Sequence, residues 1–133
     1  MEEDAERARV LIADDNVDAR EMYRQFLVAR GYIVSVASDG EEAVTRALNE
    51  RFDIVVLDLA LPKLDGIQVV TQLRSFTSTR GLPVVTLSAQ TGEHVRGAAV
   101  EAGADLALEK PLPPQDLESA IRVFVDRGKR SGK

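Results

Sequence analysis

The chain has 133 residues, 44% hydrophobic and 29% charged, so one globular domain with an adequate core is expected. Its formal net charge of −5 argues against a nucleic-acid or membrane surface, since both favour a basic face. Cysteine is absent, no apolar run approaches the roughly 20 residues that span a bilayer, and the charged N-terminus lacks a signal core, so a cytoplasmic protein is the simplest interpretation.

The first half of the chain alternates short apolar runs with amphipathic segments. Residues 1–8 are polar, and we expect a disordered tail there. Apolar runs at 10–13, 33–36 and 54–57 predict strands. The spacing predicts buried helix faces formed by Ala19, Met22, Tyr23, Phe26 and Leu27 and, in the next helix, by Ala43, Val44, Ala47 and Leu48. Ser38 with Glu41 predicts a capping box at the start of that second helix.

The second half continues the same alternation. Asp65 is interpreted as the cap of a helix that begins near Gly66, with a buried face formed by Ile67, Val70, Leu73 and Phe76. Residues 83–87 predict a fourth strand, 91–101 a helix weakened by its glycines, and 106–109 a fifth strand. Pro114 begins a last helix with an apolar stripe to Val125. Residues 127–133 are expected to form a flexible basic tail or the stub of a linker.

Five strand–helix alternations predict an α/β domain over residues 9–126. The pattern favours a single doubly wound parallel sheet with helices on both faces. Because crossovers are right-handed, few topologies remain, and one is the five-stranded flavodoxin-like order 2-1-3-4-5. In that order the carboxyl ends of strands one and three lie side by side and open into one crevice.

Polar residues follow several of the predicted strands and would meet in that crevice: Asp14 and Asp15, Asp58, Ser88 and Lys110. Three carboxylates about 5 Å apart repel by roughly 3 kcal/mol per pair at an effective dielectric of 20, which either a raised pKa or a bound cation relieves. Hard oxygen ligands suit Mg²⁺ or Mn²⁺. A metal, an ammonium and a hydroxyl around one carboxylate suit phosphoryl transfer, with Asp58 as the nucleophile that forms an acyl phosphate.

At this point the sequence resembles the receiver domains of two-component response regulators, over roughly residues 9–125. The motifs that carry the resemblance are Leu11-Ile12-Ala13-Asp14-Asp15, the loop from Asp58 to Gly66 (DLALPKLDG), Leu87-Ser88-Ala89, and Gly103-Ala104-Asp105 leading to Lys110-Pro111. Each motif alone is weak. In this order and at this spacing they are highly specific.

The resemblance implies a role for each of these residues. Asp58 looks like the phosphoacceptor, loaded from a histidine kinase or a His-containing phosphotransfer protein. Asp15 and Asp58 look like direct Mg²⁺ ligands, Asp14 like a ligand through water, and the Ala60 carbonyl like the backbone ligand. Ser88 and Lys110 look like the phosphate-sensing groups, and the Lys110–Pro111 bond is similar to one that is usually cis.

The resemblance also implies a signalling role rather than an enzyme's. Such a protein catalyses its own phosphorylation, loses the phosphate slowly to water, and switches a surface for protein contact. That surface would be the face of the helix at 91–101, the strand at 106–109 and the helix after Pro114. A homodimer or an output partner would bind there.

Two positions depart from the family pattern. Ala107 stands where the family usually carries an aromatic residue that turns inward on activation. We therefore expect the output to run through shifts of residues 88–101 instead. Ala60 and Gln90 would flank the path of the hydrolytic water, and the sign of their net effect does not follow from the sequence. His94, the single histidine, is expected to face solvent.

Other interpretations remain open. Asp14 and Asp15 taken alone could form a solvated turn or a helix cap. A degenerate receiver would act as a constitutive docking module. A haloacid-dehalogenase-like phosphohydrolase would want a second acid at Ala60, and an FMN carrier of the same topology would not place Asp14-Asp15-Asn16 against a phosphate.

Overall fold

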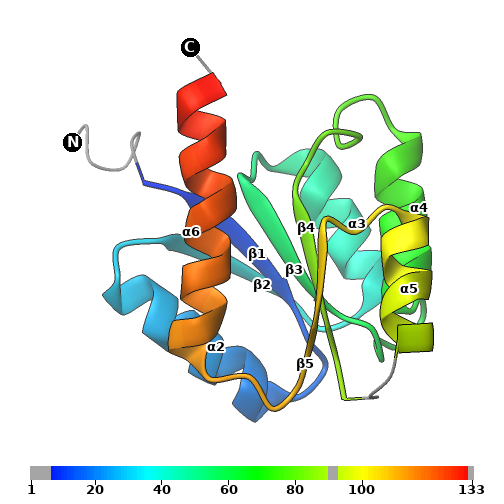
Figure 1. Cartoon of the computed structure of the whole chain (residues 1–133), viewed down its shortest axis with the longest axis horizontal. Coiled ribbons are helices and arrows are strands. Elements are labelled where there is room, and N and C mark those ends of the chain that lie inside the picture. Colours follow the sequence, from blue (N-terminus) through cyan, green and yellow to red (C-terminus); the bar gives the residue numbers. More distant parts are fainter. Residues whose placement is uncertain (1–6, 90–92, 132–133) are drawn as a thin grey trace.

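The fold is one five-stranded parallel sheet between two helix layers (Figure 1). The computed structural model describes residues 7–89 and 93–131. Its elements are β1 (Arg9–Ala13), α2 (Val17–Ala29), β2 (Ile33–Ala37), α3 (Gly40–Asn49), β3 (Ile54–Asp58), α4 (Gly66–Ser75), β4 (Val84–Ser88), α5 (Glu93–Ala102), β5 (Leu106–Glu109) and α6 (Pro114–Ser131). The strand order β2-β1-β3-β4-β5 confirms the predicted topology.

The helices cover both faces of the sheet. Figure 1 shows α2 and α6 on one side and α3, α4 and α5 on the other. Two buried clusters fill the spaces between the layers, one around Leu11, Val55 and Leu57 and the other around Ile12 and Val56. Because successive strand residues point to opposite faces, the central strands are buried on both sides. All five residues of β3 are buried, so its last residue, Asp58, sits on a rigid support.

Side-chain caps begin helices α2, α3 and α4. Asp65 and Gln68 form a capping box at the start of α4, which confirms Asp65 as a cap. The capping box predicted at Ser38 and Glu41 was wrong by one residue. Asp39 is the N-cap of α3 and accepts the Glu42 N–H at 2.8 Å. The Glu42 carboxylate reaches back to the Ser38 N–H at 2.8 Å, so the same polar residues cap the helix in a shifted register.

Three residues predicted to be buried lie at the margins of their helix faces. Met22 is 43% exposed, Leu48 38% and Phe76 40%. Leu48 lies in the last turn of α3, and Phe76 follows the end of α4 with an extended backbone, so neither reaches the sheet. Periodicity alone overestimates how wide a helix face the sheet covers.

The last helix is longer than predicted. The apolar stripe predicted a helix as far as Val125, with a flexible basic tail or linker stub from residue 127, and α6 continues to Ser131. Basic residues are favourable at the carboxyl end of a helix, so this composition supports extra turns instead of breaking them. No helix in the described part of the chain is long and apolar enough to cross a membrane.

Arg74, at the end of α4, joins the loops that precede β4 and β5. Its guanidinium donates to the carbonyls of Leu82 at 2.7 Å and Gly103 at 2.8 Å, and to Asp105 at 3.0 Å. Asp105 also accepts the Val84 N–H at 2.8 Å. Gly103 has a φ of 122°, and a Cβ there would lie 2.8 Å from the Arg74 side chain. This network holds the amino-terminal ends of β4 and β5 in place.

Candidate functional site

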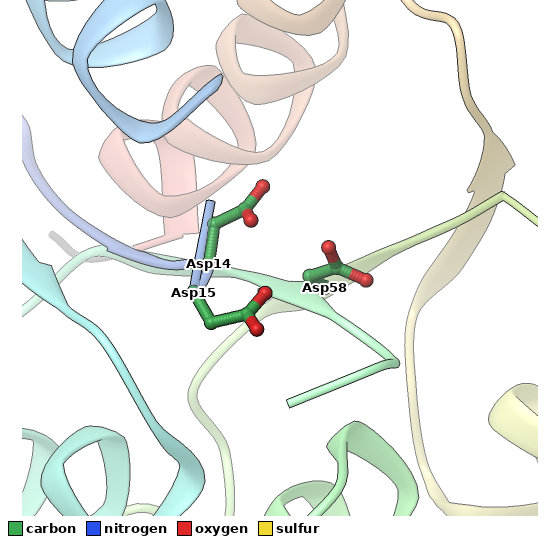
Figure 2. Close-up of side chains that lie close together, drawn as sticks. All are labelled: Asp14, Asp15 and Asp58. Atoms are coloured by element: carbon green, nitrogen blue, oxygen red, sulfur yellow. The ribbon is translucent and has the colours of Figure 1, made fainter. Parts of the chain in front are cut away.

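Three carboxylates meet at the carboxyl ends of β1 and β3. Asp14 and Asp15 follow β1, and Asp58 ends β3, the neighbouring strand in the sheet. One oxygen from each acid lies within 4.8 Å of one from each of the others. Figure 2 shows the three carboxyl groups gathered at this end of the two strands. The convergence expected from the sequence is therefore present.

Backbone donors fix two of these acids. Asp14 is 1% exposed, and its Oδ1 accepts the Asn16 N–H at 2.9 Å. Asp58 is 8% exposed, and its Oδ1 accepts the Ala60 N–H at 3.0 Å. Asp15 is exposed to solvent. The pocket thus has a buried, oriented side and an open side.

Lys110 places its ammonium between the two buried acids. Its Nζ lies 2.9 Å from Asp58 Oδ2 and 3.0 Å from Asp14 Oδ2. Burial opposes the charged ammonium, but the hydrogen bonds with Asp58 and Asp14 outweigh it and raise the pKa of Lys110. The site therefore keeps a fixed positive charge beside Asp58 at neutral pH.

Ser88 lies at the same edge of the sheet. It follows Leu87, the residue paired with Asp58 in the register of β3 and β4, and it is 6% exposed. Its carbonyl accepts the Lys110 N–H at 2.8 Å. The structure thus brings Ser88 and Lys110 to the strand ends that carry the acids, whereas Gln90 lies outside the described residues.

The loop after Asp58 is held against the start of α3. The Gly40 N–H donates to the Pro62 carbonyl at 3.1 Å, and Lys63 pairs with Asp39 at 3.5 Å. A Cβ on Gly40 would lie 1.9 Å from the Leu64 carbonyl oxygen, so the two backbones are in direct contact. These contacts fix the course of the loop that contains Ala60.

Two polar contacts near the site were not predicted from the sequence. Arg20 donates to the Asp14 carbonyl at 3.0 Å. Tyr23 was predicted as a core residue and is 2% exposed, but its hydroxyl also donates to the Leu112 carbonyl at 2.9 Å. The available signal was chemical, because a buried tyrosine hydroxyl needs a hydrogen-bond partner.

The donor set suits a small divalent cation. Three carboxylates within bridging distance, one of them exposed, offer hard oxygen ligands and leave room for water. The pocket also concentrates negative charge that one ammonium offsets in part. The residues present therefore fit Mg²⁺ or Mn²⁺.

Comparison with known proteins decides the family. Residues 10–122 match the family model of the response regulator receiver domain. The chain belongs to this family. It is a receiver domain, and receiver domains are the phosphoacceptors of two-component signalling. This membership decides against the phosphohydrolase and FMN-carrier interpretations, and the predicted cis Lys110–Pro111 bond is present.

The receiver is similar to both regulators and isolated receiver structures. Response regulator MprA from Mycobacterium sp. (strain KMS) is 40% identical over 119 residues, which are 90% of this chain and 51% of that protein. The chain thus spans about half the length of the curated relatives it matches. The chemotaxis response regulator CheY4 of Vibrio cholerae is 30% identical, with a TM-score of 0.84 over 89% of this chain and 98% of that one.

A third similar structure bears on the acidic pocket. The receiver domain of sensor histidine kinase PA1611 from Pseudomonas aeruginosa is 27% identical, with a TM-score of 0.84 over 90% of this chain and 98% of that one. That structure has a magnesium ion coordinated in its active-site cleft. Receiver domains bind Mg²⁺ at an acidic pocket and interact with histidine kinases, and the present receiver has the acidic cluster.

Proposed function

We propose that Asp58 is the residue of this receiver that accepts the phosphoryl group. Its Oδ1 is oriented by the Ala60 N–H, and its Oδ2 lies beside the Lys110 ammonium. In the transfer, a carboxylate oxygen of Asp58 forms a bond to phosphorus. The bond to the donor breaks, and its electron pair leaves with the donor imidazole. The observation that carries this proposal is the placement of Asp58 within the acidic cluster and against Lys110.

We further propose that the acidic cluster holds the divalent ion that this chemistry uses. Asp14, Asp15, Asp58 and the Ala60 carbonyl would hold Mg²⁺ or Mn²⁺, and the ion would supply positive charge to the phosphoryl oxygens. The metal-ligand roles rest on the grouped carboxylates. The loop contacts of Gly40 support a fixed position for the Ala60 backbone.

Lys110 and Ser88 would bind the phosphorylated state. An acyl phosphate adds nearly two negative charges to Asp58, and Lys110 Nζ already lies 2.9 Å from that side chain. Charge-assisted hydrogen bonds of this kind are about twice as strong as neutral ones. Ser88 would add a hydroxyl donor from the neighbouring strand.

The output surface would be the face of α5, β5 and α6. Arg96 of α5 pairs with Glu109 of β5, and Glu109 is the register partner of Ser88. Next to this pair, a shallow hollow between α5 and β5 is lined by Arg96, Gly97, Val100, Asp105, Leu106 and Ala107. Ala107 leaves this space without an aromatic side chain. These contacts support an output through movement of α5, toward a second copy or another output partner.

The rest of the proposal concerns the setting of the domain. The phosphate would come from a histidine kinase or a His-containing phosphotransfer protein, and the receiver would lose it slowly to water without acting on another substrate. Residues 9–126 would form the functional domain. A cytoplasmic location stays a prediction, as does any output carried by a longer protein.

A small phosphodonor tests the assignment of Asp58. The full chain is incubated with Mg²⁺ and acetyl phosphate and then analysed by intact mass. We expect a phosphoryl adduct on the wild type and on the control Asp116→Asn, which changes an exposed acid in the first turn of α6. We expect none on Asp58→Asn. An adduct that persists on Asp58→Asn contradicts the assignment, and no adduct on any protein favours the constitutive docking module.

A further inference from the structure

We infer that Tyr23 is a positioning residue for Lys110 and acts through the loop that joins β5 to α6. This inference rests on the proposed function, in which Lys110 contacts the phosphoryl group on Asp58. The hydrogen bond that the structure gives the Tyr23 hydroxyl goes to a backbone carbonyl and not to one of the acids. Its effect would pass through the backbone that carries Lys110.

The Tyr23 hydroxyl crosses from α2 to that backbone. The ring is 2% exposed in the cluster that also contains Val10, Ile12 and Val56. The hydroxyl donates to the Leu112 carbonyl at 2.9 Å, across 89 positions of sequence. Leu112 lies two residues after Lys110, so the bond falls at the base of the segment that presents the ammonium.

The sequence of the loop makes this bond important. Pro111, Pro113 and Pro114 have no backbone N–H, so three of the four residues after Lys110 cannot donate a main-chain hydrogen bond. Before the prolines, the Lys110 N–H donates to the Ser88 carbonyl at 2.8 Å. The segment 110–112 is thus fastened to β4 at one end and, through Tyr23, to α2 at the other.

The position of this segment determines where the lysine ammonium can lie. Lys110 has a flexible four-carbon stem, so a fixed backbone is needed to hold Nζ within 3.0 Å of both Asp14 and Asp58. Loss of the Tyr23 bond would widen the range of backbone positions. The ammonium would then spend less time beside Asp58, which weakens phosphoryl binding and reduces its competition with a divalent ion for the same carboxylates.

A single-atom change tests this inference. Tyr23→Phe keeps the buried ring and removes the hydroxyl. Tyr32→Phe is the matched control, because its hydroxyl bonds Glu118 at 3.0 Å on α6, away from the acidic cluster. Apparent affinity for beryllofluoride, an acyl-phosphate mimic, is measured at saturating Mg²⁺, and Mg²⁺ affinity is measured separately by calorimetry.

We expect Tyr23→Phe to bind beryllofluoride about fivefold more weakly, the effect of losing one net hydrogen bond. Its Mg²⁺ affinity should be equal to or tighter than that of the wild type, an outcome that general loss of structure would not produce. Tyr32→Phe should match the wild type in both measurements. Urea unfolding of each variant shows that it is folded under the assay conditions.

Two results would overturn the inference. One is unchanged beryllofluoride affinity in Tyr23→Phe, and the other is an equal weakening of both ligands in both variants. If the wild type itself binds no beryllofluoride and forms no adduct on Asp58, the proposed function fails and the inference falls with it. Normal wild-type binding with an unaffected Tyr23→Phe counts against the positioning role alone.

Discussion

The Nζ of Lys110 lies 2.9 Å from Oδ2 of Asp58, although 52 positions of sequence separate the two residues. The same ammonium lies 3.0 Å from Oδ2 of Asp14. Both acids are buried, and a buried carboxylate is costly unless it is paired. Lys110 is therefore the counter-ion of these two buried acids.

Replacement of this counter-ion should affect stability and metal binding in opposite directions. Lys110→Met leaves Asp14 and Asp58 without their ammonium, so we expect the free energy of unfolding to fall by about 1–3 kcal/mol without metal. The affinity for Mg²⁺ should rise because a competing cation is gone. Urea unfolding with and without Mg²⁺ measures both effects. The control Lys63→Met removes a pair with Asp39 in which the lysine is largely exposed, and it should change stability by less than about 1 kcal/mol. Weaker Mg²⁺ binding by Lys110→Met would contradict the expectation.

The contact between Gly40 and the loop after Asp58 leads to a second prediction. A Cβ on Gly40 would meet the Leu64 carbonyl oxygen at 1.9 Å, so Gly40→Ala must displace a backbone. We expect the free energy of unfolding of Gly40→Ala to fall by about 2–4 kcal/mol, which is at or above the usual cost of overpacking. Gly97→Ala in α5 meets open space and should add about 0.5–1 kcal/mol through helix propensity. Chemical denaturation of both variants measures the difference. Equal stabilities would show that the loop yields without strain.

Tyr32 should make stability depend on pH in the alkaline range. Burial and then the hydrogen bond with Glu118 raise the pKa of Tyr32 to about 12, above its ordinary value of 10.0. Because the pKa of Tyr32 is higher in the folded state than in the unfolded state, the neutral hydroxyl contributes to the free energy of unfolding. This contribution is complete below pH 10 and is lost as the pH rises through 12. Between pH 10 and pH 12 the free energy of unfolding of the wild type should fall by about 2 kcal/mol more than that of Tyr32→Phe. Unfolding curves at a series of pH values check this, and parallel curves for the two proteins would refute it.

Helix α5 should respond to occupation of the site. Because Ala107 cannot act as an aromatic switch, we expect amide exchange in α5 to change when beryllofluoride and Mg²⁺ bind. The open space beside Gly97 and the hollow beside Ala107 support this expectation, because they leave room for α5 to shift against β5. Hydrogen exchange measured by mass spectrometry is the test, with α3 as the internal reference. Unchanged exchange in α5 would show that the signal leaves by another route. Asp58→Asn serves as the negative control, and its α5 exchange should stay unchanged when beryllofluoride and Mg²⁺ are added.

The sequence was sufficient for the topology and for the grouping of the site residues. Apolar runs such as residues 54–57 predict strands buried on both faces, and β3 has that burial. Once the strand order follows, the parallel register places Asp14, Asp15 and Asp58 at one edge. Both steps depend on short-range patterns and general topology, so a single sequence contains the necessary information.

Other features depend on exact packing and were missed or misplaced. The exposure of Met22 depends on how far the sheet covers α2, and the shift of the α3 cap from Ser38 to Asp39 depends on competition between adjacent polar residues. The Tyr23–Leu112 bond joins segments 89 positions apart, and no local pattern marks it. Each of these needs coordinates, because each is decided by contacts between elements.

The two ends of the strands are held by different kinds of contact, and the Arg74 network holds the amino-terminal ends. At the amino-terminal ends of β4 and β5, the Arg74 guanidinium donates hydrogen bonds to the carbonyls of Leu82 and Gly103. These contacts lie at the opposite end of the strands from the acidic cluster. The acid-bearing edge is held by ion pairs that an incoming anion or cation can rearrange. A ligand that rearranges the ion pairs of Lys110 can therefore change the carboxyl ends of the strands while the Arg74 network keeps their amino-terminal ends in place.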